Sequence, residues 1–189
     1  MNKQLVEEAI AYISDLFKDN SDGHDLDHSL RVYRNALKIA EKEKGDLEII
    51  TMAALLHDAD DHKLFNTTDN ENARKFLISH GFNEEKIAKI CEVINAISFS
   101  KNRGKRPETI EGQIVQDGDR LDALGAIGIA RTFAYGGTHH RSLSSSVEHF
   151  HEKLLLLKDE INTAEGKRIA EERHRFMEEF LKRYREETQ

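Results

Sequence analysis

The sequence predicts an all-α protein that folds as one compact helical bundle. The chain of 189 residues contains a single proline, Pro107, and proline is the residue that most strongly interrupts helices. Leucine, alanine, glutamate, lysine and arginine, which favour helices, are abundant. Apolar residues recur at spacings of three and four, as on one face of a helix, and we find no convincing strand pattern.

The first helices are expected over residues 3–17 and 27–44. Gly45 supplies a stop for the second helix, because glycine readily adopts the left-handed conformation that ends helices. Asp46 then suits the N-cap of a third helix, because its side chain can accept a backbone N–H of the first turn. This third helix is expected to end near His57.

Five further helical patterns follow along the chain. They cover residues 68–79, 84–97, 109–133, 145–157 and 163–187. The third of these patterns is expected to divide near Ala123. Its second half is apolar nearly all round and contains Gly125 and Gly128, so it predicts a central helix that neighbours approach closely. Two loops, around residues 104 and 140, are candidate rims of a pocket.

Composition limits the compartment and the partners. The single cysteine, Cys91, excludes a disulfide within the chain and a CxxC site, which fits a reducing compartment. The N-terminal segment carries acids at short intervals and no uninterrupted apolar stretch, so we expect a cytoplasmic protein with no membrane partner. The net charge of −7 disfavours a nucleic-acid polymer as partner but permits a small anionic substrate.

The sequence MAALLHDADDHKLF places His57 and Asp58 at the end of an apolar helix. A buried carboxylate is costly unless it is compensated, and a divalent ion bound by imidazole and carboxylate would compensate it. A His-Asp pair alone is common by chance. It gains weight from GHDLDHSLRV, where His28 opens a helix, and from QDGDRLDALGAIGIA, where acids enter the most apolar helix.

This ordered set of H, then HD, then D resembles the HD-domain superfamily of metal-dependent phosphohydrolases. The resemblance implies that His28, His57, Asp58 and Asp119 bind one divalent metal ion. Asp119 is preferred because DGDRLDA is similar to the DxDxxD form of the last motif of the family. Asp117 is the alternative ligand.

The resemblance extends over nearly the whole chain. The segments FAYGG and HFHEKLLLLK are similar to a bacterial subgroup of uncharacterised HD hydrolases, some of them similar to nucleoside triphosphate pyrophosphohydrolases. We therefore expect one HD-type domain over residues 1–189. Its metal-binding core lies at about 20–135, and C-terminal helices at about 145–187 pack on this core.

The mixed nitrogen and oxygen ligand set favours manganese, iron, cobalt, nickel or zinc over a site built only for calcium or magnesium. Among these metals we expect manganese, with iron, cobalt, nickel, zinc or magnesium as alternatives. Water bound to such an ion becomes a nucleophile near neutral pH. We expect hydrolysis of a phosphate ester or anhydride bond in a nucleotide, by a phosphatase or pyrophosphohydrolase. The alternatives are a nucleotide-binding regulatory HD module with little or no catalysis, and a plain helical scaffold with chance histidines.

Asp58 and Asp61 are the candidate catalytic acids. Asp61 lies four residues after His57, so it faces the same pocket if the helix continues that far. Several HD enzymes have a glutamate there, in an HDxxE arrangement, that orients or deprotonates the attacking water. Aspartate is shorter, so the alternative is a solvated or capping acid. Asp122 is expected to hydrogen-bond a ligand histidine and set its tautomer, with helix capping as the alternative.

The candidate substrate-binding residues are basic side chains near these motifs. They are Arg31, His24, Arg120, Lys63 and Lys153. Arg31 lies one turn from His28, and Arg120 is next to Asp119, so each would clamp a phosphate or pair with a neighbouring carboxylate. The alternatives for His24 and Lys63 are a solvated loop residue and a cation at a helix end.

Overall fold

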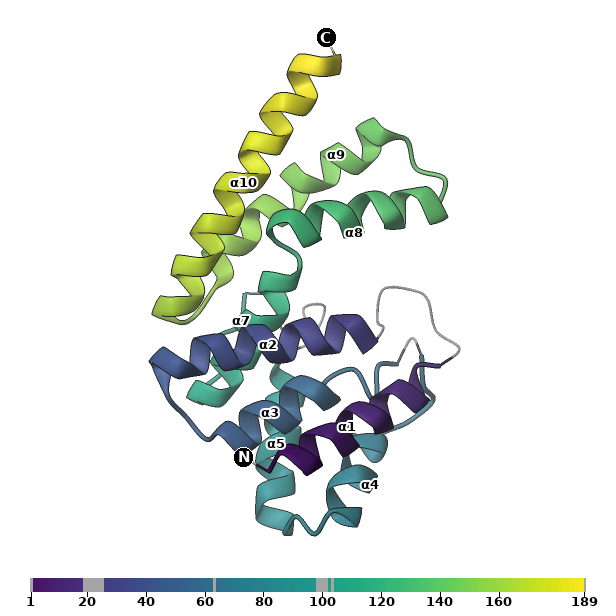
Figure 1. Cartoon of the computed structure of the whole chain (residues 1–189), viewed down its shortest axis with the longest axis vertical. Helices are drawn as coiled ribbons and strands as arrows, with labels where there is room; N and C mark the ends of the chain where they lie inside the picture. The colour runs from purple at the N-terminus through teal and green to yellow at the C-terminus, as the bar shows by residue number, and fades with distance from the viewer. Residues whose placement is uncertain (1, 19–25, 63, 98–101, 103, 189) are drawn as a thin grey trace.

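The computed structural model describes residues 2–18, 26–62, 64–97, 102 and 104–188. These residues form helices and connecting turns, with no strand in the described ranges, so the all-α prediction is confirmed. Figure 1 shows a lower group of helices that includes α1 to α5 and an upper group of α8, α9 and α10, with α7 between the two groups. Within the same ranges, no helix is long and apolar enough to cross a membrane.

The N-terminal helices agree closely with prediction. They are α1 (Lys3–Leu16), α2 (Leu26–Glu43) and α3 (Leu47–Leu56). Asp46 caps α3 as expected, because its carboxylate accepts the backbone N–H groups of Glu48 at 2.9 Å and Ile49 at 3.2 Å. Residues 49–56 are all buried, so α3 is a central helix of the core and ends at His57.

The next two helices are α4 (Glu71–Ser79) and α5 (Glu84–Ile97). The helix α5 has the predicted bounds, whereas α4 begins three residues later than predicted. Asn70 adopts a left-handed conformation, with a φ of 57°, which cannot be part of a right-handed helix. The first turn of α4 is held by Asp60, whose carboxylate accepts the backbone N–H groups of Asn72 and Ala73.

The predicted division near Ala123 is confirmed, with α7 (Ile110–Asp122) before it and α8 (Gly125–Thr138) after it. The expectation of a central second half is wrong, because the buried residues of α8 are three glycines. Its apolar side chains are partly exposed, and the helix extends into the predicted loop around residue 140. A close approach does occur at Gly125, where an added Cβ would lie 3.0 Å from Cγ of Arg173.

The C-terminal part consists of α9 (Leu143–Glu152), a 3-10 helix η1 (Leu154–Glu160) and α10 (Ala164–Thr188). The single helix predicted over 145–157 is therefore two segments, which meet at Lys153 with a φ of −138°. The long helix α10 packs on α8, η1, α7 and α2.

The crossing of α2 and α7 is the contact that positions the candidate site. Gly118 of α7 lies directly against α2, because a Cβ at this position would be 3.0 Å from the carbonyl oxygen of Val32 and 3.2 Å from the backbone nitrogen of Ala36. A larger side chain would push the two helices apart. This close crossing places His28 of α2 opposite Asp119 of α7.

Candidate metal centre

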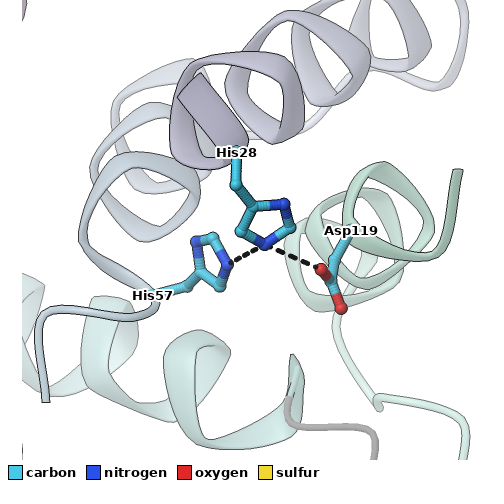
Figure 2. Close-up of side chains that lie close together, drawn as sticks. All are labelled: His28, His57 and Asp119. Atoms are coloured by element: carbon cyan, nitrogen blue, oxygen red, sulfur yellow. Dashed lines mark hydrogen bonds and ion pairs between the residues drawn. The ribbon is translucent and has the colours of Figure 1, made fainter. Parts of the chain in front are cut away.

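Two histidines and an aspartate converge from three different helices. His28 lies in the first turn of α2, His57 is the C-cap of α3, and Asp119 lies in α7. Figure 2 shows the three side chains directed toward one another. The Nε2 atom of His28 is 3.3 Å from Nε2 of His57 and 3.4 Å from Oδ1 of Asp119.

Asp58 lies beside the same two imidazoles. Its Oδ2 atom is 3.3 Å from Nε2 of His57 and 3.6 Å from Nε2 of His28. The two histidines and Asp119 each offer an atom within 4.8 Å of the others, which is the spacing of a metal-binding group. The structure therefore brings together His28, His57 and Asp119, with Asp58 in contact with both imidazoles.

The hydrogen bonds of the two histidines test whether this group fits a metal ion. The Nδ1 atom of His57 lies 2.9 Å from the carbonyl oxygen of Ala54, and Nδ1 of His28 lies 2.8 Å from Oδ2 of Asp122. A carbonyl and a carboxylate only accept, so in its neutral form each imidazole carries the hydrogen on Nδ1 and presents a lone pair at Nε2. The two lone pairs then lie beside each other and beside the carboxylates of Asp58 and Asp119, and these groups repel one another unless a metal ion or a proton lies between them.

The spacing of these atoms also suits a cation. Metal–nitrogen and metal–oxygen bonds of about 2.0–2.2 Å put neighbouring ligand atoms roughly 3 Å apart. The observed separations of 3.3 to 3.6 Å are close to that value. The residues therefore fit a divalent metal ion.

The pKa values of both histidines are raised, because the carboxylates around them stabilise positive charge. Burial alone would lower the pKa of His28, but its hydrogen bonds with Asp119 and Asp122 outweigh burial and raise the pKa to about 9. Burial likewise opposes protonation of His57, and the neighbouring carboxylate of Asp58 raises its pKa. The protein surrounds these imidazoles with carboxylates that favour a cation at this point.

Asp122 organises the side of the centre behind His28. Its buried carboxylate accepts hydrogen bonds from Nδ1 of His28, from Nε of Arg31 at 2.6 Å and from Nη1 of Arg131 at 2.5 Å. Burial would raise the pKa of Asp122, but the hydrogen bonds from His28 and Arg31 hold it well below its usual range. The predicted hydrogen bond between Asp122 and a ligand histidine is therefore observed.

Arg131 was not found from the sequence. It lies in α8, nine residues after Asp122 and between the segments QDGDRLDALGAIGIA and FAYGG, neither of which includes it. One signal was available, because Arg131 is the only charged residue between Leu124 and Thr138. A lone arginine in an otherwise apolar helix needs a partner or a ligand, since an unpaired charge is costly to bury.

Arg120 and Asp117 have partners outside the cluster. Arg120 is buried, its Nη1 donates to the backbone carbonyl of Glu160, and its Nη2 lies 3.3 Å from the Glu160 carboxylate. The carboxylate of Asp117 accepts hydrogen bonds from Asn162 and Thr163, just before α10. Of the two alternative ligands, the structure brings Asp119 to the histidines and directs Asp117 toward α10.

The other predicted site residues lie at different places. Arg31 is one turn from His28 and contacts the same Asp122. Asp61 lies in the turn that follows α3, with Oδ1 3.6 Å from Nδ1 of His62. Lys153 is the C-cap of α9. His24 and Lys63 lie outside the described residues.

Comparison with known proteins identifies the family. Residues 25–124 match the HD domain. The chain belongs to the HD-domain family. All four predicted metal ligands of this HD protein lie inside the matched range, and Arg131 lies beyond it. HD-domain proteins bind a divalent metal ion, in agreement with the donor set formed by His28, His57 and Asp119.

Similar HD proteins and structures cover nearly the whole chain. The uncharacterised protein YpgQ of Bacillus subtilis is 41% identical over 185 residues, which span 93% of this chain and 90% of YpgQ. The crystal structure of YpgQ in complex with ADP superimposes with a TM-score of 0.83 at 35% identity, over 96% of this chain and 97% of that chain. The crystal structure of an HD-superfamily hydrolase from Bacillus thuringiensis superimposes with a TM-score of 0.82 at 38% identity, over 98% of this chain and 97% of that chain.

Proposed function

We propose that this protein is a phosphohydrolase that uses a bound divalent metal ion to cleave a phosphate ester or anhydride bond in a nucleotide. The observation that carries the proposal is the convergence of His28, His57 and Asp119 within 4.8 Å of one another, with the carboxylate of Asp58 beside both imidazoles. The hydrolase fold of the HD family supports the same reaction class.

His28, His57, Asp58 and Asp119 would hold the ion, for which we propose manganese. Such an ion, when bound, lowers the pKa of coordinated water and polarises phosphoryl oxygens. The hydrogen bonds to Asp122 and to the Ala54 carbonyl would keep both imidazoles in the tautomer that binds metal.

The remaining proposed roles concern binding of the substrate and removal of a proton from the attacking water. Asp61 lies in the turn that follows the metal ligands His57 and Asp58, and we assign it the role of accepting a proton from the attacking water. Arg31 would bind a phosphate oxygen, because its guanidinium group contacts the same carboxylate as His28 and its side chain is partly exposed. The contact of Arg120 with Glu160 favours a structural role for Arg120 instead.

The nucleotide class of the substrate is supported by the relative YpgQ. That protein was crystallised in complex with ADP, and its structure is similar to this chain over nearly the full length. A panel of nucleoside mono-, di- and triphosphates, incubated with the protein and manganese, will test the proposal. Separate assays for phosphate and pyrophosphate distinguish a phosphatase from a pyrophosphohydrolase.

Substitution of Asp58 tests the link between metal and turnover. Asp58→Ala should abolish both bound metal and hydrolysis, because it removes a carboxylate that contacts both imidazoles. Metal content is measured by elemental analysis, and Asp15→Ala, an exposed acid of α1, is the matched control. Full activity in metal-free Asp58→Ala protein would refute the proposal. Nucleotides that bind tightly but stay intact with every metal would indicate a binding module.

A further inference from the structure

Arg131 reaches the metal centre from a helix that supplies none of the predicted ligands. Its Nη1 atom is 2.5 Å from Oδ2 of Asp122 and 3.3 Å from Nδ1 of His28. Arg31 approaches the same carboxylate from α2, with Nε 2.6 Å from Oδ1 and Nη2 3.1 Å from Oδ2. One carboxylate thus holds two guanidinium groups beside one ligand imidazole.

The side chains of the two arginines are more exposed than the side chain of Asp122, which they both contact. The side chain of Asp122 is 1% exposed, whereas those of Arg31 and Arg131 are 26% and 33% exposed. Arg120, which has a structural contact with Glu160, is by contrast only 4% exposed. The two arginine side chains are therefore partly exposed beside the metal centre, while the carboxylate that both of them contact is buried.

The position of the arginines indicates which part of a substrate they would meet. Arg131 lies beside Nδ1 of His28, whereas the converging ligand atoms lie around Nε2 on the other edge of the ring. The width of an imidazole ring therefore offsets this guanidinium group from the metal centre. A group bonded to a phosphate at the metal centre would have to span this offset to reach the arginines.

Guanidinium groups are well suited to bind a phosphate group. Their planar arrangement of N–H donors matches two oxygens of a phosphate at once, which makes the hydrogen bonds directional as well as strong. The hydrogen bonds to Asp122 hold each guanidinium group in place before a substrate arrives. This reduces the conformational entropy that binding would otherwise cost.

We propose that Arg131, together with Arg31, forms a subsite for a second phosphate of the substrate, next to the phosphate at the metal centre. The inference rests on the proposed function and narrows its substrate to nucleotides with at least two phosphates. Arg131 is assigned to substrate binding, and Asp122 is a positioning residue that acts through both arginines and His28.

Binding measurements with a nucleotide of two phosphorus groups and one of a single phosphate test this subsite. The methylene-bridged analogue of ADP and AMP are titrated calorimetrically into manganese-loaded wild type, Arg131→Gln and Arg131→Lys. Loss of a charge-assisted hydrogen bond should weaken binding of the analogue roughly tenfold to a hundredfold in Arg131→Gln. AMP affinity should stay nearly unchanged, because AMP lacks the second phosphate. Arg175→Gln, an exposed arginine of α10, controls for the loss of one charge.

Arg131→Lys and the manganese content separate this role from a purely structural one. Lysine keeps a positive charge near Asp122 but loses the planar fork, so the protein should retain metal and stability while its affinity for the analogue still falls. Unchanged affinity for the analogue in both variants, or an equal loss for the analogue and AMP, would overturn the subsite. A wild type that hydrolyses no nucleotide would refute the proposed function, whereas the affinity comparison would still test Arg131.

Discussion

Three acids of one helix lie within six residues of one another, but only two of them, Asp119 and Asp122, contact His28. On a helix with 3.6 residues per turn, Asp117 and Asp119 point about 160° apart, whereas Asp119 and Asp122 point about 60° apart. Asp119 and Asp122 therefore share the face toward His28, and Asp117 faces α10. The roles of these carboxylates follow from their direction and from what packs there.

Asp122→Asn tests the positioning role at this scale. Asparagine keeps the shape but removes the charge that accepts from His28 and the two arginines, so the imidazole is held less firmly. Loss of such a supporting partner typically lowers metal affinity about 10- to 100-fold. A manganese titration measures the change, with Asp15→Asn as the exposed control. Wild-type affinity in Asp122→Asn would show that the hydrogen bond has no part in metal binding.

Single contacts between elements hold α7, α2 and α10 in register. The carboxylate of Asp117 accepts the backbone N–H groups of Asn162 and Thr163, both at 2.8 Å, and the Thr163 hydroxyl at 2.7 Å. It thereby ties α7 to the start of α10. Arg173 of α10 donates to the carbonyl oxygen of Leu121 and to the side chain of Asn35. These contacts connect α10 to both of the other helices.

Asp117→Ala separates a structural acid from a metal ligand. Its removal leaves buried donors of Asn162 and Thr163 without their acceptor, so the free energy of unfolding should fall by about 1–3 kcal/mol. Manganese content should be unchanged at a temperature where the variant is folded. Denaturant unfolding and elemental analysis measure the two quantities. Asp119→Ala should give the reverse pattern, and loss of metal in Asp117→Ala alone would make Asp117 the ligand.

The candidate site depends on the packing of the whole molecule. Its proposed ligands come from α2, from the end of α3 and from α7, and Arg131 comes from α8. His28 and Asp122 are 94 residues apart in the chain, and Arg131 and His28 are 103 apart. An unfolded chain would not hold these groups together, so metal binding should be linked to folding.

Manganese should accordingly raise the melting temperature. A free ion concentration of 100 times the dissociation constant stabilises the native state by about 2.7 kcal/mol. For a chain of this length that corresponds to a shift of roughly 5–10 °C. Thermal unfolding with added manganese, and after its removal with a chelator, measures the shift. His57→Ala should abolish it, and an equal shift in that variant would place the binding elsewhere.

The sequence by itself determined the helical class, most helix bounds and the family. Helix propensity, apolar spacing and the Asp46 cap depend on residues close together in the chain, so they can be predicted from the sequence. The break between helices near Ala123 could be predicted for the same reason. The motif H, then HD, then D pointed to His28, His57 and Asp119, which the structure brings together.

Only the tertiary structure decided how distant elements meet. An apolar pattern records the tendency to be buried but does not say against what, so α8 was expected in the centre although α3 lies there. Spacing alone did not reveal that Arg120 contacts Glu160 or that Arg131 reaches Asp122. Such pairs depend on helix crossings set by the packing of many side chains, and no local stretch of sequence contains that information.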